Sequence, residues 1–126
     1  MSKSRREIFE AAWDGLKSQD FRQAMDKNGC QYKTDDGLRC AIGWCMNEED
    51  INQYVATHKG FKLGGTVSNP DVRELAGISY DDKEFALALQ SIHDNFGRPL
   101  EPELLKQRLI GFAYAHVMED VVEEGL

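Results

Sequence analysis

The stretch from Gly29 to Cys45 constrains the fold more than any other part of this sequence. It contains all three cysteines, Cys30, Cys40 and Cys45, and one of the two tryptophans. Residues 34–37, with the sequence TDDG, form its turn signal, since glycine tolerates the positive φ that tight turns need. Polar and apolar residues alternate on both sides of this turn, as in half-buried strands. We therefore expect a small antiparallel β-hairpin with strands at 30–32 and 38–40.

The rest of the chain has the spacing of amphipathic helices. Ser4 and Glu7 form a capping-box pattern at the start of the first stripe. We expect helical segments at 4–16, 21–25, 40–46, 51–56 and 70–75, then one from Asp81 or Asp82 to about Phe96 and one from 101–103 through Val121. The sequence thus predicts an α+β fold, mainly α, in which a helical core packs on one small hairpin.

Length and charge narrow the classes of protein that fit. The 126 residues, 41% of them hydrophobic, suit a single globular domain over 1–126. No apolar run is long enough for a membrane span or a signal peptide, so we expect a cytoplasmic protein. The net charge of -7 argues against unaided binding to nucleic acid or to an anionic membrane. It permits a basic protein partner.

The cysteines raise the question of a metal site. An odd number of cysteines is unlike a disulfide framework, and in a reducing compartment they are thiols or metal ligands. The candidates for zinc are Cys30, Cys40, Cys45 and His93, but the cysteine spacings lack the two-residue gap of a zinc knuckle. Free cysteines commonly pack as small buried hydrophobes. We therefore expect no metal and no cofactor.

A catalytic thiol is the second chemical possibility. Cys40 is expected at a strand-to-helix junction, where a helix N-terminus lowers a thiol pKa. His93 could act as its base, with Asp94 as the orienting acid. Adjacent helical residues point about 100° apart, so we expect Asp94 to be poorly placed to orient His93. The favoured interpretation is structural, with Gln90, His93 and Asp94 bonding to the hairpin backbone or to the turn after the helix.

Acidic residues crowd the end of the chain. Glu119, Asp120, Glu123 and Glu124 fall at the C-terminal end of the last predicted helix, where the helix dipole disfavours negative charge. That end should therefore fray or meet something basic. These four residues are our candidates for partner binding.

Three short patterns carry a resemblance to a known group of proteins. They are CxY at 30–32, GxxCAIG at 37–43 and LQxxHD at 89–94. The chain resembles small uncharacterised proteins that are common in phages and mobile elements. The resemblance transfers no activity, but it implies a small cytosolic accessory protein that acts on a host system.

Two functional hypotheses from different classes follow. The leading one is a non-enzymatic acidic protein that binds another protein, as a phage or mobile-element modulator of a host factor. The alternative is a cysteine- and histidine-centred site, either zinc-binding or a thiol-dependent enzyme, built on Cys30, Cys40 and His93. A homodimer that covers exposed parts of the hairpin or of the last helix is a third possibility.

Overall fold

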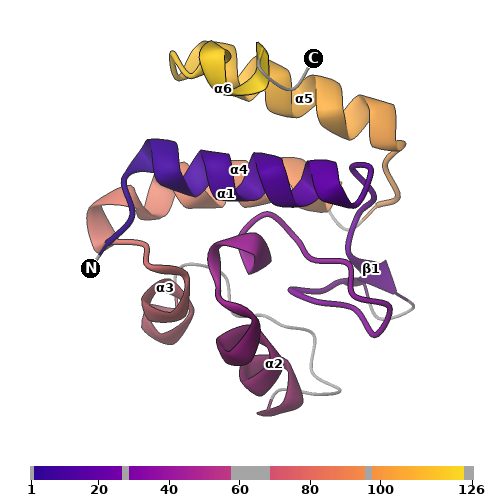
Figure 1. Cartoon of the computed structure of the whole chain (residues 1–126), viewed down its shortest axis with the longest axis vertical. Coiled ribbons are helices and arrows are strands. Elements are labelled where there is room, and N and C mark those ends of the chain that lie inside the picture. The colour runs from indigo at the N-terminus through magenta and orange to yellow at the C-terminus, as the bar shows by residue number, and fades with distance from the viewer. Residues whose placement is uncertain (1, 27–28, 58–68, 96–97, 124–126) are drawn as a thin grey trace.

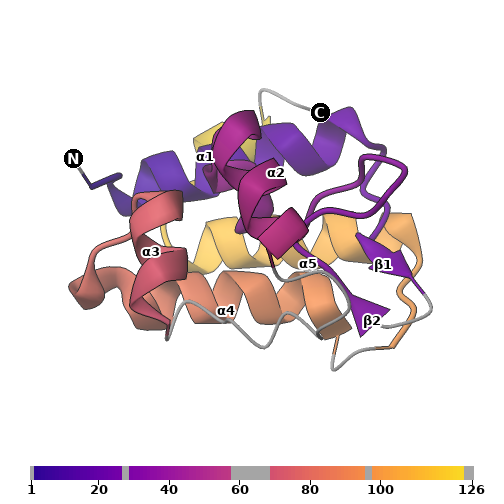
Figure 2. The same cartoon turned by 90° about the horizontal axis from the view of Figure 1, so that it is seen from below.

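Helices stack in three layers in the computed structural model, which describes residues 2–26, 29–57, 69–95 and 98–123 (Figure 1). The middle layer contains α1 and α4, and in Figure 2 they run roughly parallel, with α5 visible between them. One outer layer contains α5 and α6, and the other contains α2 and α3. The helix bounds are α1 Arg5–Ser18, α2 Glu48–Thr57, α3 Pro70–Ala76, α4 Lys83–Asp94, α5 Pro102–Ala115 and α6 Glu119–Glu123, with short 3-10 helices η1 Gly43–Cys45 and η2 Tyr80–Asp82.

The first helix begins as its sequence predicts. The Ser4 hydroxyl accepts a hydrogen bond from the Glu7 amide, and the Glu7 carboxylate accepts one from the Ser4 amide, which completes the capping box. The predicted apolar stripe of α1 is buried. Gly15 lies under the indole of Trp44, where an added Cβ would fall 2.1 Å from Trp44 Cγ. Glycine therefore lets η1 pack directly on α1.

The predicted α+β fold class is wrong, because the expected β-hairpin does not form and the described chain is mainly helical. In the described part of the chain, strand pairing is limited to two-residue strands, β1 (Met25–Asp26) with β2 (Gly29–Cys30), which lie before the expected turn. Across 30–40 a single bridge joins Lys33 to Arg39.

Side chains explain why no longer ladder forms there. Gly37 turns the chain at φ +89, as expected. The Leu38 amide, however, donates to Thr34 Oγ1 at 3.1 Å, and the Arg39 amide donates to Gln19 Oε1 at 3.0 Å. Of these two donors, the Leu38 amide is one that a ladder would use. The Arg39 amide points away from the opposite strand, because the bonds on either side of the bridge run from Thr34 N to Leu38 O and from Cys40 N to Tyr32 O. An isolated pair of strands is only marginally stable, and here it is limited to this bridge.

The helix predicted over 21–25 is also absent. The chain turns sharply through Asp20 and Phe21, at φ +56 and +58, and the Phe21 amide bonds to Leu16 O at 2.8 Å. This turn lets Phe21 pack against Trp13, with ring centroids 5.0 Å apart. Burial of the aromatic ring thus outweighs the local helical pattern.

The third and fourth helices follow their local signals. Pro70 lies in the first turn of α3, and Gly77 closes it at φ +71. The Lys3 amide donates to Gly77 O, and Lys3 Nζ donates to Ala76 O, so the N-terminal segment binds the end of this helix. Residues 83–94 form α4, within the predicted range.

The single last helix that the sequence predicts is two helices. α5 ends at Ala115, and the Met118 amide closes the turn by bonding to Ala113 O at 2.7 Å. Val117 takes φ +57 in this turn, and Met118 is buried. Glu119 and Asp120 therefore lie in the first turn of α6, where the helix dipole favours acids rather than opposing them.

The buried apolar side chains of the described residues form one cluster. Its largest members come from α1, α4 and α5, with Ile42 and Ile51 entering from the opposite layer. No helix in the part of the chain that the structure describes combines the length and apolar composition needed to cross a bilayer.

Val117→Gly should stabilise the protein by about 1 kcal/mol, measured as the free energy of unfolding in urea. A β-branched residue at positive φ costs roughly 1–2 kcal/mol, and glycine avoids that cost. Val117 is 78% exposed, so little packing is lost. The matched control is Ala115→Gly, an exposed helical position that should lose about 0.5–1 kcal/mol. A lower free energy of unfolding in both variants would contradict the inference that the backbone at Val117 is strained.

Candidate functional site

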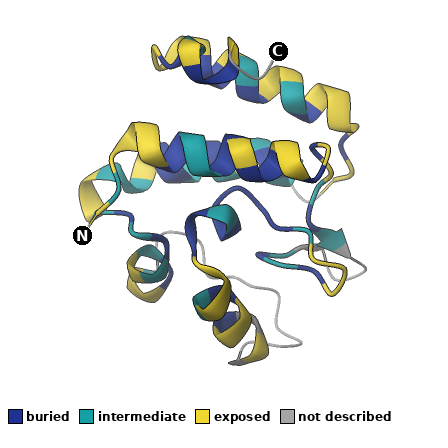
Figure 3. Cartoon of the chain, viewed as in Figure 1, coloured by how far each residue is buried: buried dark blue, intermediate teal, exposed yellow. Residues whose placement is uncertain are grey.

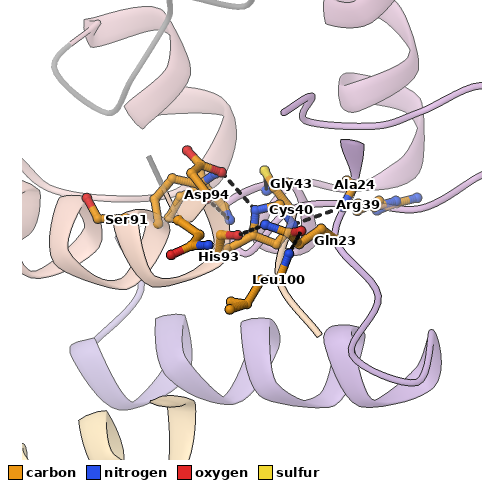
Figure 4. Close-up of polar contacts among 12 residues, drawn as sticks. Gln23, Ala24, Arg39, Cys40, Gly43, Ser91, His93, Asp94 and Leu100 are labelled. Carbon is orange, nitrogen blue, oxygen red and sulfur yellow. Dashed lines mark hydrogen bonds and ion pairs between the residues drawn. The ribbon is translucent and has the colours of Figure 1, made fainter. Parts of the chain in front are cut away.

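The predicted site residues meet where the end of α4 contacts two segments of the preceding chain. Figure 4 shows His93 and Asp94 of α4 beside Cys40 and Ala24. We call this group the Cys40–His93 cluster, and its members are Gln23, Ala24, Cys40, Gln90, His93 and Asp94. The structure therefore brings together three of the predicted candidates, Cys40, His93 and Asp94.

His93 is fully buried and both of its ring nitrogens are engaged. Nε2 accepts a hydrogen bond from the Ala24 amide at 3.0 Å. Since Nε2 is an acceptor, the ring proton lies on Nδ1, which donates to Asp94 Oδ1 at 2.8 Å. The expectation that Asp94 would be poorly placed to orient His93 is thus wrong. The Asp94 side chain bends back toward the His93 ring. The angle of about 100° between neighbouring helical positions allows this contact.

Gln90 links the same carboxylate to another segment. Its Oε1 accepts from the Ile42 amide at 3.0 Å, and its Nε2 donates to Asp94 Oδ1 at 2.8 Å. This backbone-binding role is the structural interpretation that the sequence favours for Gln90 and His93. The amides that they bind, at Ile42 and Ala24, lie outside the predicted strands.

Two further glutamines complete the set, and the sequence analysis missed both. Gln23 donates from Nε2 to His93 O at 2.8 Å and accepts from the Leu100 amide at 2.6 Å. Gln19 Nε2 donates to Arg39 O at 2.8 Å, and Gln19 Oε1 accepts from both the Arg39 amide and the Trp44 indole. Glutamine is usually a surface residue, and no local pattern predicts that the buried Gln19 and the half-buried Gln23 bind backbone groups.

Cys40 lies in this cluster with its thiol buried. Its Sγ accepts from the Gly43 amide at 3.2 Å. Burial raises the pKa of the Cys40 thiol far above its ordinary value, and the Asp94 charge raises it further. The amides of Gly43 and Ile42 lower that pKa, as a helix start was expected to do, but desolvation outweighs them. The result is an inert thiol rather than an activated nucleophile.

Cys45 does not extend the site. Cys45 is buried against α1, with Sγ 3.7 Å from Ile8 O, and burial raises its pKa to about 12. Cys40 and Cys45 are free thiols. The Cys30 side chain lies outside the described residues. Within the described part of the chain, no group of three histidine, cysteine or acidic side chains is arranged to hold a metal ion.

Three of the predicted partner-binding acids, Glu119, Asp120 and Glu123, lie on the opposite side of the molecule, in α6. Arg6 of α1 binds Asp120 through its two Nη atoms and also pairs through Nε with Glu10 at 2.8 Å. The bond from Arg6 lowers the pKa of Asp120. Glu123 accepts from the Tyr114 hydroxyl at 3.1 Å, which raises the pKa of Tyr114. Glu124 lies outside the described residues.

Comparisons with protein-family models, with curated proteins and with solved structures gave no match for this chain.

In a Cys30→Ser variant at pH 8, Cys40 and Cys45 should react with a thiol reagent only when the protein unfolds. Raising the Cys45 pKa from 9.0 to about 12 lowers its thiolate fraction by roughly 1,000-fold, and burial removes access as well. Stopped-flow labelling measures this, and the protein in denaturant should show two reactive thiols. A thiol that reacts at the rate of free cysteine in the folded protein would restore the active-site interpretation.

Proposed function

We propose that this chain is a non-enzymatic, acidic protein that binds a basic protein partner, and that it acts as a phage or mobile-element modulator of a host factor. The proposed contact surface is the α5–α6 corner, defined here as Tyr114, Val117, Glu119 and Glu123.

The observation that carries the proposal is the composition of this corner. Tyr114 and Val117 are large apolar residues, 54% and 78% exposed, and acidic residues of α6 follow them directly. Exposed aromatic and aliphatic side chains supply binding area, and charges around them speed and orient association with an oppositely charged partner. Figure 3 shows exposed residues along both α5 and α6.

The buried groups support a binding role by elimination. Cys40 and His93 are enclosed. Cys40 Sγ and His93 Nε2 bond to the protein's own backbone, and His93 Nδ1 bonds to Asp94. These contacts leave neither group available to a substrate without local unfolding. The free thiols suit a reducing, cytoplasmic location. The three sequence patterns, which resemble those of phage and mobile-element proteins, are the support for the modulator role.

Affinity capture from a bacterial lysate tests the proposal. The full chain should retain a partner protein that Glu119→Lys/Glu123→Lys loses by about tenfold or more, since each tenfold change is about 1.4 kcal/mol of binding free energy. Asp120 is left unchanged in this variant because it binds Arg6 and helps to hold α6.

The matched control is Glu48→Lys/Glu49→Lys, which makes the same charge change at exposed positions in the first turn of α2. Circular dichroism establishes that all three proteins are folded. Equal capture by the corner variant, or capture of no partner by the wild-type chain, would contradict the proposed function.

A further inference from the structure

The side of α5 that faces away from the other helices carries an unusual set of residues. Leu104 and Tyr114 are 43% and 54% exposed, and Gly111 lies between them. At about 100° per residue, these three positions fall within an arc of roughly 80°, opposite the buried stripe that includes Leu105 and Leu109. The exposed Gln107 falls in the same arc, and its side chain donates to Glu103 at 3.0 Å. We call Leu104, Gly111 and Tyr114 the outer face of α5.

Gly111 makes no close contact with another element in the described part of the chain. Apart from the backbone of its own helix, nothing described lies within 4 Å of the position that a Cβ would take, and its φ is not in the left-handed region. Glycine is less favourable than alanine inside a helix, so a side chain there would stabilise the helix. Without one, the helix backbone is open at Gly111, one turn after Gln107, and another backbone can approach it closely.

Charge defines what could occupy this face. Glu101 and Glu103 are exposed at one end of α5, and Glu119 and Glu123 follow its other end. The two basic residues of the helix point to its flanks. Lys106 lies over the Phe21 ring at 5.9 Å, and Arg108 donates to Asn95 at 2.9 Å. The outer face of α5 thus has acidic groups at both ends, and this charge complements a basic partner.

The same charges disfavour a second copy of this chain as the occupant. If two α5 helices packed antiparallel across Gly111, Glu103 of one copy would face Glu119 of the other. If they packed parallel, Glu103 would face its own counterpart. Either arrangement places acids against acids between two chains that each carry a net charge of -7.

We infer that the outer face of α5 docks one amphipathic helix of a basic partner protein. The apolar side of that helix crosses α5 at Gly111, between Leu104 and Tyr114, and its lysines or arginines meet the acids at the two ends. This is the helix-on-helix mode of recognition. The inference rests on the proposed function and adds the form of the partner and the point of closest contact.

Two synthetic peptides of about 20 residues test the inference directly. Both are amphipathic helices with leucines on one face, and one has lysines in its end turns where the other has glutamates. Fluorescence anisotropy should show that the lysine peptide binds the full chain at least tenfold more tightly than the glutamate peptide. Equal binding of the two peptides would overturn the inference.

Gly111→Gln separates binding from folding. Glutamine favours a helix over glycine and finds open space here, so the melting temperature should rise by about 2–6 °C. Affinity for the lysine peptide should fall at least tenfold, because the side chain fills the point of contact. The control is Ala88→Gln, an exposed position on α4, which should bind as the wild type does.

The outcomes distinguish this inference from the proposed function. If Gly111→Gln binds the lysine peptide as tightly as the wild type, the docking position is wrong, even if charge reversal at Glu119 and Glu123 abolishes capture of a partner. If capture from the lysate fails but the lysine peptide binds in a Gly111-dependent way, the proposed function fails and the docking face remains.

Discussion

The chain between α1 and α2 depends on side chains for hydrogen bonds that a sheet would otherwise provide. The Arg39 amide donates a hydrogen bond to Gln19, and the Ile42 amide donates one to Gln90. The Ala24 amide donates one to His93. A buried amide left without a partner costs roughly 1–3 kcal/mol, so these bonds allow an irregular segment to be buried at all. They also connect that segment to the two central helices, since Gln19 follows α1 and the other two lie on α4. The layer that contains α2 is therefore positioned by polar contacts as well as by apolar packing.

This use of polar groups also explains the chemistry of the Cys40–His93 cluster. A histidine between a backbone amide and a carboxylate resembles a catalytic arrangement, yet its acceptor nitrogen is occupied by the chain itself. The Cys40 thiol sits in the same enclosed region, where desolvation opposes formation of the thiolate. Residues that suggest an active site in the sequence thus act as supports for the backbone. Exposed apolar side chains lie beside acidic ones in the other outer layer, at Leu104 and Tyr114 of α5 and at Val117 before α6, while Tyr80 of η2 is exposed elsewhere.

Local signals in the sequence predict the helices whose ends depend on local contacts. The capping box at Ser4 and the closing glycine at Gly77 lie where the sequence places them, because each works within a few residues. The hairpin could not be excluded in the same way, since Gln19 binds the backbone of Arg39 from a position far away in the sequence. The break after Ala115 was hidden too, because a valine at positive φ contradicts local preference and is compensated by burial of Met118. In the candidate site, the sequence predicts that Gln90 and His93 bind backbone groups. No sequence pattern indicates the same role for Gln19 and Gln23.

Native-state hydrogen exchange tests most directly whether polar side chains hold this segment. The amides of Ala24, Arg39 and Ile42 lie in irregular chain, yet each donates to a buried or half-buried side chain. We predict that they exchange as slowly as the central amides of α1 and α4, through global unfolding. Rapid exchange at these three amides, while α1 and α4 remain protected, would contradict the account.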